Sequence, residues 1–469
     1  MQMNDDVYTR NGFAAVKAER DVDRLDIEGD WPEALCGSLY RIGPNPQFEP
    51  IVPYNPLLGD GMVHAFHIAG RRVSYLNRWV RTLQWELEHT AGRALFATSG
   101  DRRQNDPAVA GIATDGVANT NLVWHGGRLL ALEEGHPPIE LHPETLDTLG
   151  VWTFDGALPS NMCAHPKVDP RTGEMVFFAN FPDGRFTGEL AWYVASASGR
   201  LLRQGRIRTP YPALIHDFAV TRDFIVFIVC PVTVSIPRAM AGGPPLAWEP
   251  DLQTFAGVVR RDGTDGVRWF TRSSCFAWHV QNAWDDGDGI SVELCEQASP
   301  AFPRTDGLMP DEGRRMQHLT RWELNRHRGD RVRHHVLHDQ VCEYPRYDER
   351  FAMSQTRHGF FACHGGPGTA DPFHRGIGHF DQHRERLSTF HLGARCAVSE
   401  PVFVPRSSGA PEGDGFVLCV VYDEAADRSA LTLFDAQSIE RGPVARAMLE
   451  HRVPMGFHGC WLPGKRRQD

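Results

Sequence analysis

The chain has 469 residues, is 41% hydrophobic and 23% charged, and carries a net charge of −10. This length allows two to four domains or one large single-domain architecture. The acidic balance argues against nucleic acid as a partner, because a nucleic-acid-binding face needs a basic surplus. No stretch approaches 18 uninterrupted apolar residues, and the polar, acidic N-terminus is unlike a signal peptide. The ten scattered cysteines form no C-x-x-C pair, which indicates reduced thiols and a cytoplasmic protein.

Short β-type runs recur along almost the whole chain, and Gly, Asp, Asn or Pro ends each of them. In chain order they include GSLYRIG, HAFHIAGRRVSYLNRWVRT, NTNLVWHGGRLLALEE, GEMVFFANF, FIVFIVCPVTVSI, GISVELCE and GFVLCVVYDE. Residues 85–97, WELEHTAGRALFA, form the best amphipathic helical pattern. Many short strands with regular turns predict an all-β sandwich, barrel or propeller. Because no linker is evident, we expect a single propeller domain over residues 1–469.

Four histidines lie in apolar or strand-like contexts. They are His165 in CAHPKVDP, His216 in LIHDFAV, His279 in CFAWHVQNAW and His458 in GFHGCW. Their intervals are 51, 63 and 179 residues, and the last is close to three times 60. A repeat of roughly 50–60 residues is a propeller-blade length, which predicts seven or eight blades. Inner strands of all blades converge on one axis, so these histidines are expected to meet there, although a lone strand histidine is more often a hydrogen-bonded core residue.

Four imidazoles without Cys or carboxylate form an unusual ligand set. Imidazole suits Fe, Zn, Cu and Ni, whereas structural zinc sites usually draw on Cys. Metal-bound histidines generally donate their second N–H to an acceptor such as a carboxylate. Three glutamates in apolar or rigid contexts are candidates for this role: Glu134, Glu343 and Glu400. Salt bridges to nearby arginines are the alternative, and the spacing leaves both possibilities open for Arg346, Arg350 and Arg406.

The chain resembles the carotenoid cleavage oxygenases over essentially its whole length. The motifs that carry this resemblance run from GSLYRIGPNPQFEP and GDGMVHAFHI to EPVFVPR and HGCWLP. The resemblance implies a seven-bladed β-propeller with a helical and loop cap over the active site. It implies that Fe(2+) is bound by His165, His216, His279 and His458, with Glu134, Glu343 and Glu400 holding three of the imidazoles. The family reaction is cleavage of a carbon–carbon double bond by Fe(II) and O₂ into two carbonyl products.

Two substrate classes occur among such enzymes. One is the long polyenes, carotenoids and apocarotenoids; the other is the phenolic stilbenes and phenylpropenes such as isoeugenol. The phenolic branch uses a tyrosine and a lysine to hold and ionise the phenol, but here the corresponding stretch FATSGDRRQNDPAVAG has no tyrosine and the lysine position is Glu133. Because a carboxylate would repel a phenolate, we expect a carotenoid or apocarotenoid, with the phenolic alkene as the alternative.

The segment IPRAMAGGPPLAW, Ile236–Trp248, is apolar and rich in Gly and Pro. It reads as too broken for an ordinary helix or strand, and it is a candidate for peripheral membrane contact at the mouth of a substrate tunnel; an ordinary packed loop is the alternative. A non-enzymatic binding platform is a further alternative, since function cannot be read from fold alone. If the protein is the oxygenase that the resemblance implies, its expected partners are a hydrophobic alkene and O₂.

Overall fold

The computed structural model describes residues 8–51, 54–98, 102–184, 186–364 and 373–464. The described chain falls into two compact units. The first consists of residues 159–391 and 411–413, and the second of the described residues within 2–158, 392–410 and 414–469. Strands dominate both units, so the all-β prediction is confirmed. All ten cysteines are free thiols, and seven of them are buried.

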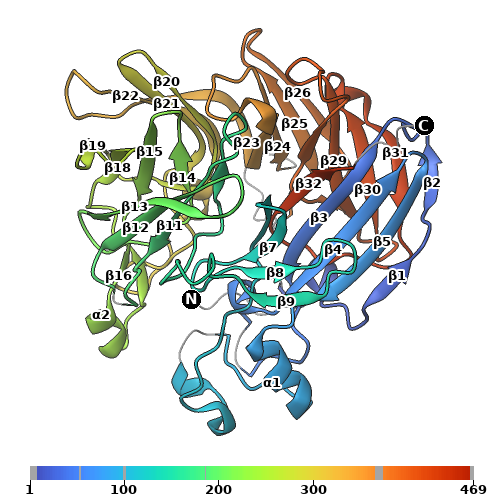
Figure 1. Cartoon of the computed structure of the whole chain (residues 1–469), viewed down its shortest axis with the longest axis horizontal. Coiled ribbons are helices and arrows are strands. Elements are labelled where there is room, and N and C mark those ends of the chain that lie inside the picture. Colours follow the sequence, from blue (N-terminus) through green and yellow to red (C-terminus); the bar gives the residue numbers. More distant parts are fainter. Residues whose placement is uncertain (1–7, 52–53, 99–101, 185, 365–372, 465–469) are drawn as a thin grey trace. The chain divides into compact units, whose positions relative to one another are not determined.

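The first unit contains two four-stranded antiparallel sheets and a longer seven-stranded one (Figure 1). The first sheet has the order β10 (Lys167–Val168), β11 (Met175–Asn180), β12 (Glu189–Ala195) and β13 (Leu201–Arg208). The second has the order β14 (Phe218–Val220), β15 (Phe224–Val229), β18 (Thr254–Arg260) and β19 (Arg268–Arg272). A two-stranded ribbon, β16 (Val232–Val234) and β17 (Leu246–Trp248), flanks the short helix α2 (Ile236–Met240).

The seven-stranded sheet follows chain order throughout. Its strands are β20 (Phe276–Asp286), β21 (Gly289–Gln297), β22 (His318–Asn325), β23 (Arg333–Tyr347), β24 (His358–Cys363), β25 (Gly376–Asp381) and β26 (Arg386–His391). Strand β23 is long enough to pair with β22 through its first part and with β24 through its last part. It therefore joins two consecutive four-stranded meanders. The 3₁₀ turns η5 (Glu312–Arg315) and η6 (Glu349–Phe351) complete this unit.

The second unit contains three sheets, two of which combine strands from distant parts of the chain. The local sheet is β6 (Asn121–His125), β7 (Arg128–Leu132), β8 (Ile139–Leu141) and β9 (Thr148–Val151). A second has the order β1 (Arg20–Val22), β5 (Arg72–Trp79), β4 (Gly61–Ala69), β3 (Cys36–Pro44) and β32 (Gly459–Pro463). The last strand of the chain therefore pairs with β3, and the blue and red strands lie side by side (Figure 1).

The third sheet of this unit also mixes the two ends of the chain. Its order is β2 (Asp26–Gly29), β31 (Pro443–Met448), β30 (Arg428–Asp435), β29 (Gly415–Asp423) and β27 (Cys396–Val398), and β28 (Val402–Pro405) also pairs with β29. The remaining elements are helix α1 (Leu83–Ala91) and the 3₁₀ turns η1 (Asn11–Phe13), η2 (Pro56–Leu58), η3 (Arg102–Gln104), η4 (Pro107–Val109) and η7 (Ile439–Arg441). The prediction of seven blades with a cap in one domain stays a prediction.

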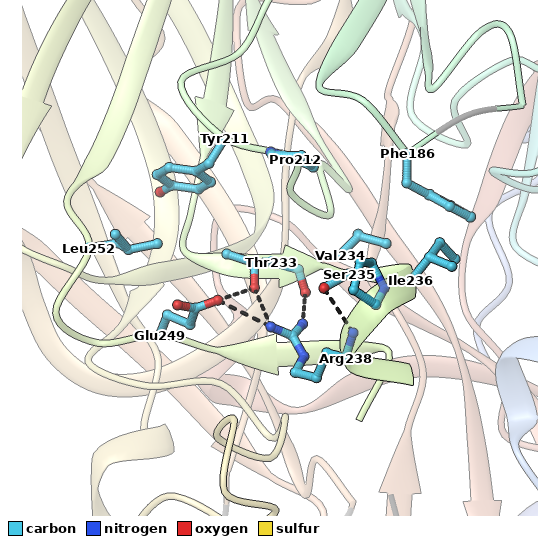
Figure 2. A pocket seen from close by; sticks show the side chains of 11 residues that line it. Phe186, Tyr211, Pro212, Thr233, Val234, Ser235, Ile236, Arg238, Glu249 and Leu252 are labelled. Carbon is cyan, nitrogen blue, oxygen red and sulfur yellow. Dashed lines mark hydrogen bonds and ion pairs between the residues drawn. The ribbon is translucent and has the colours of Figure 1, made fainter. Parts of the chain in front are cut away.

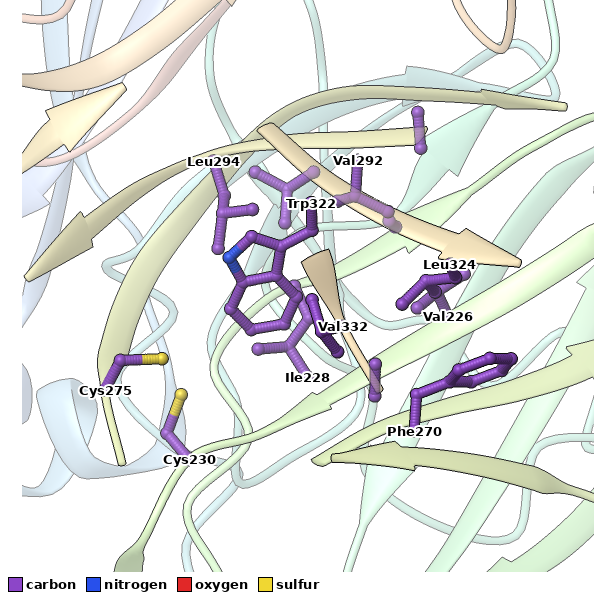
Figure 3. Close-up of a cluster of buried hydrophobic side chains, with 14 of the residues drawn as sticks. Val226, Ile228, Cys230, Phe270, Cys275, Val292, Leu294, Trp322, Leu324 and Val332 are labelled. Atoms are coloured by element: carbon purple, nitrogen blue, oxygen red, sulfur yellow. The ribbon is translucent and has the colours of Figure 1, made fainter. Parts of the chain in front are cut away.

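Alternating apolar side chains build the core between neighbouring sheets. In the first unit, Val226 and Ile228 of β15 face the cluster that also contains Leu294 of β21 and Trp322 of β22 (Figure 3). Side chains two apart on a strand point to the same face, so Val226 and Ile228 share one face of β15, and the whole strand is buried on both faces. The Trp322 ring is fully buried, and its Nε1–H donates to Glu296 at 2.7 Å, which satisfies its polar atom.

Two local predictions need correction. The helix expected over residues 85–97 begins at Leu83 and ends at Ala91. Thr82 caps its start, and Gly92 ends it in the left-handed conformation with φ of +67°. The segment Ile236–Trp248 is more regular than expected, because Ser235 caps the short helix α2 and β17 pairs with β16. No described helix is both long and apolar enough to cross a membrane.

Candidate metal centre

The candidate histidines occupy equivalent places at the edges of sheets. His165 lies two residues before β10, His216 two residues before β14, and His458 directly before β32; His279 lies within β20. Each of these four strands is the terminal strand of its sheet. Three of the histidines therefore sit just outside the strands in which the sequence placed them. An edge position leaves side chains and backbone available for contacts beyond the sheet.

The first unit brings three of these histidines together. Nε2 of His165 lies 3.0 Å from Nε2 of His216, which in turn lies 3.2 Å from Nε2 of His279. The three rings meet edge to face, with centroids 4.6–5.1 Å apart. His165 and His216 are buried and His279 is nearly so. Three imidazoles that share one small volume through the same ring nitrogen are well placed to offer those nitrogens to one ion.

Glu343 fixes the orientation of the His279 ring. Its Oε2 lies 2.6 Å from Nδ1 of His279 and also accepts the backbone N–H of Tyr344. An ionised carboxylate is only an acceptor, so Nδ1 carries the proton and Nε2 presents its lone pair. The Tyr344 ring stacks on His279 with centroids 5.5 Å apart, and its φ of +53° is uncommon for a bulky residue. Such backbone strain concentrates at functional sites.

His458 and Glu400 repeat this construction in the second unit. Oε1 of Glu400 lies 2.9 Å from Nδ1 of His458, and Oε2 accepts the backbone N–H of Gly459 at 2.9 Å. Both side chains are buried. The Nε2 atom of His458 is therefore left as the lone-pair nitrogen, as in His279. In each case one carboxylate holds an imidazole and a backbone N–H, that of the residue after the glutamate for Glu343 and that of the residue after the histidine for Glu400.

The arginines that were alternative partners bind other carboxylates. Arg346 pairs with Glu349 at 2.5 Å, and Arg350 with Asp348 at 2.6 Å. Arg406 pairs with Asp414 at 2.8 Å and with Asp435 at 2.9 Å. Glu134 is partly buried two residues after the end of β7, and its predicted contact with an imidazole stays a prediction.

Glu133, the residue at the lysine position of phenol-cleaving enzymes, is bound by its own surroundings. Its Oε2 accepts the backbone N–H of Val117 at 2.9 Å, and its Oε1 contacts Nδ1 of His136. Its side chain is 12% exposed. The carboxylate is thus engaged within the loop, which weakens the electrostatic argument against a phenolic substrate. Residues 99–101 of the stretch without tyrosine lie outside the described residues.

Two charged residues next to the histidines were not singled out from the sequence. Asp217 follows His216 and lies 2.7 Å from the ammonium group of Lys167, which itself follows His165 by two positions. An aromatic neighbour of the cluster was missed as well. The Trp278 ring meets the His216 ring edge to face, with centroids 4.9 Å apart. The available signal was a charged side chain inside an otherwise apolar run, LIHDFAV, where burial demands a partner.

A separate hollow lies beside helix α2 in the first unit. It has a volume of about 460 Å³, and Figure 2 shows Tyr211, Phe186 and Ile236 around it. On its floor Arg238 donates to the Thr233 carbonyl at 2.7 Å and to Glu249 at 3.2 Å. The polar side chains of Thr233, Arg238 and Glu249 are therefore engaged with one another.

The donor set fits a divalent transition metal. The Nε2 atoms converge at 3.0 and 3.2 Å, which is close enough for all three to coordinate one ion placed between them. Imidazole is a preferred ligand of Fe, Zn, Cu and Ni, and carboxylate-oriented histidines are usual around such ions. The described chain therefore combines an all-β fold with a histidine cluster that is able to hold a metal ion.

Comparison with known proteins gives the family. The family described as "Retinal pigment epithelial membrane protein" matches residues 13–463. Isoeugenol monooxygenase of Pseudomonas putida is 36% identical over 95% of both chains. Lignostilbene dioxygenase of Pseudomonas brassicacearum superposes with a TM-score of 0.93 at 34% identity, covering 97% of this chain and 98% of that one. An apocarotenoid oxygenase of Synechocystis superposes with a TM-score of 0.86 at 28% identity, covering 97% of this chain and 98% of that one.

The chain belongs to the carotenoid cleavage oxygenase family. The predicted resemblance and the β-propeller class are thereby confirmed, and the protein is an oxygenase.

Proposed function

We propose that this protein is a non-haem Fe(II) oxygenase that cleaves the side-chain double bond of a phenylpropene or stilbene. The expected products are an aromatic aldehyde and a second carbonyl compound. The observation that carries the proposal is the cluster of three imidazoles, one of them held by Glu343. The reaction balances as one alkene plus one O₂ giving two carbonyl groups. Isoeugenol would thus give vanillin and acetaldehyde.

The choice of a phenolic alkene reverses the preference reached from the sequence. The higher identities are to isoeugenol monooxygenase and lignostilbene dioxygenase, and the apocarotenoid oxygenase follows at 28%. The engagement of Glu133 with Val117 and His136 weakens the electrostatic objection to a phenol. The residues that hold the phenol are not the tyrosine and lysine of the phenolic branch, so substrate recognition differs in detail.

We propose His458 as the fourth ligand, joining His165, His216 and His279. Its support is the blade-like spacing, the family membership, and the Glu400 contact that leaves Nε2 as the lone-pair nitrogen. Glu134, Glu343 and Glu400 are proposed as the carboxylates that orient imidazoles. Neutral ligands leave the ion its full positive charge, which suits iron that must react with O₂.

When bound, iron supplies the ferrous centre at which O₂ is activated. The chain's own residues have other tasks. Glu343 keeps the proton on Nδ1 of His279, so the ligand nitrogen stays unprotonated. The Tyr344 and Trp278 rings stack on or abut imidazoles and shield the cluster from water. The protein's part is thus to position the alkene and to exclude competing reactions, while the metal would activate O₂.

Contact with a membrane or another apolar phase near Ile236–Trp248 is a further part of the proposal. It is supported by the exposure of Met240, at 83%, and of Ile236, at 46%. Ala247 and Trp248 are buried in the ribbon, so only the first half of the segment is available for such contact.

The test is a side-by-side incubation of the Fe(II)-loaded enzyme with isoeugenol, resveratrol and apo-8′-carotenal, with products identified by mass. Vanillin or hydroxybenzaldehyde as the main product supports the proposal. A shortened apocarotenal as the main product, with both phenols untouched, overturns the substrate class. A metal-loaded protein that cleaves none of the three, and binds them all, favours the binding platform. The apoprotein is the control.

A further inference from the structure

The buried Asp217 carboxylate of the first unit binds groups from three separate parts of the chain. Its side chain is 3% exposed, and it receives three N–H groups. The Lys167 ammonium lies 2.7 Å from Oδ1, the N–H of Phe218 donates to Oδ1 at 2.7 Å, and the N–H of Val280 donates to Oδ2 at 2.7 Å. Both oxygens are therefore engaged, one of them by a full positive charge. Burying a carboxylate is costly unless it is satisfied in this way.

The groups around this carboxylate come from three different sheets. Lys167 lies on β10, Asp217 immediately precedes β14, and Val280 lies on β20. Each is a close sequence neighbour of a clustered histidine, because Lys167 follows His165 by two positions, Asp217 follows His216, and Val280 follows His279. A single side chain thus ties together the three backbone segments that carry the three imidazoles.

The backbone around Val280 is irregular in a way that suits this role. The register between β20 and β21 shifts on both sides of Val280. A bulge of this kind disrupts the ladder locally and redirects side chains, and bulges concentrate next to active sites. Asp217 accepts the Val280 N–H at this irregular point, which fixes the backbone from which His279 projects.

We propose that Asp217, with its counter-ion Lys167, is a positioning residue that sets the spacing of the His165, His216 and His279 imidazoles. The inference rests on the proposed metal site and deepens it. Without the carboxylate, the three backbone segments would lose the polar contact that they share. The convergent nitrogens, 3.0 and 3.2 Å apart, would then relax away from one another. Loss of Asp217 would therefore weaken metal binding without removing any ligand.

The decisive variant is Asp217→Asn, which keeps the side-chain volume. An amide has one oxygen and one NH₂ group, so it cannot accept from both Lys167 and Val280 and instead turns a donor toward one of them. Apoprotein is titrated with Co(II), followed by its ligand-field absorption. We expect roughly 10–100-fold weaker binding, as for other residues that orient metal ligands, together with a changed absorption spectrum.

A matched control separates positioning from a general loss of stability. Asp381 is another buried carboxylate of the same unit, 6% exposed and paired with Arg357 at 2.6 Å, and it accepts two backbone N–H groups. It contacts none of the candidate ligands. Asp381→Asn should lower the thermal stability while leaving the Co(II) affinity and spectrum as in the wild type. Circular dichroism and melting curves are recorded for both variants.

Lys167 provides an independent arm if Asp217→Asn fails to fold. Lys167→Arg keeps a cation and should retain Co(II) affinity, whereas Lys167→Met leaves a buried unpaired carboxylate and should weaken it. In the double variant Asp217→Asn with Lys167→Met, the two losses should not add, because both act through one contact. Wild-type affinity and spectrum in folded Asp217→Asn, or in folded Lys167→Met, would overturn the positioning role. Wild-type protein that binds no metal would instead overturn the proposed function itself.

Discussion

Nδ1 of His279 and Oε2 of Glu343 lie 2.6 Å apart, although 64 positions separate these residues in the chain. The second carboxylate oxygen, Oε1, is buried without a hydrogen-bond partner among the described residues. The carboxylate is therefore held on one side only, by His279 and the N–H of Tyr344. A change at Glu343 should therefore act mainly on the His279 ring and on the backbone at Tyr344.

Replacing Glu343 should weaken metal binding in a graded way. In Glu343→Gln the amide oxygen can still accept the Nδ1–H of His279, but the negative charge is lost and an NH₂ group is buried without an acceptor. In Glu343→Ala the ring also loses its anchor. We expect metal affinity to fall by about 10-fold in Glu343→Gln and about 100-fold in Glu343→Ala. Chelator competition measures both, and equal affinities of wild type and Glu343→Ala would contradict the orienting role.

Removing a single histidine ligand should remove most of the iron. Purified wild-type protein is expected to hold close to one iron per chain, and His279→Ala should lose most of the iron and activity while staying folded. The exposed His391 of β26 gives the matched control, because His391→Ala leaves the cluster intact. Elemental analysis measures the iron per chain, and circular dichroism shows whether each variant is folded. Full iron occupancy in His279→Ala would refute the ligand assignment.

Stability should fall as pH rises toward neutrality because of Asp60. Desolvation by burial, with the nearby Glu88 as a second cause, raises the pKa of the Asp60 carboxyl from 3.8 to about 7. A carboxyl with a raised pKa contributes its stability fully below pH 4 and loses it as pH climbs to about 7. Asp60→Asn is neutral throughout, so it should show a smaller loss of melting temperature between pH 5 and pH 8. An equal loss of melting temperature between pH 5 and pH 8 in both proteins would show that Asp60 is not the cause of the pH dependence.

The exposed apolar side chains of α2, Ile236 and Met240, should matter only when the substrate is held in an apolar phase. Met240→Ser removes the most exposed apolar side chain of this segment without touching the histidine cluster. We expect weaker liposome binding and slower turnover of liposome-held substrate, with turnover of water-soluble substrate unchanged. Leu149→Ser, on the exposed face of β9, is the control for a generic loss of surface hydrophobicity. Identical liposome binding of wild type and Met240→Ser would support the packed-loop alternative.

The parts of the site that depend on local pattern were predictable, and those that depend on distant pairing were not. The strands follow from apolar runs ended by turn residues, but the positions of His165 and His216 just before terminal strands depend on how those strands pair. The helix boundary was missed because Gly92 adopts a left-handed conformation and the N–H groups of Leu95 and Phe96 turn back to Glu88.

The partners of the glutamates could not be deduced from spacing. Arginines stand closer in sequence to Glu343 and Glu400 than any histidine does, and only the three-dimensional arrangement brings His279 and His458 to them. The same holds for Asp217, whose partners lie on β10 and β20. The substrate class was judged from Glu133 as a free charge, whereas its carboxylate is engaged by Val117 and His136.

The pairing of β32 with β3 has a consequence for biosynthesis. β3 ends at Pro44, whereas β32, which covers its outer edge, begins only at Gly459, so β3 is synthesised long before this partner. Until then β3 presents unpaired backbone groups, which invite association with other nascent chains. Transfer of Gly459–Pro463 to a point ahead of β3, in a circular permutant, would shorten this exposed interval. The order of the strands thus leaves this edge of β3 open during most of the synthesis between the two strands.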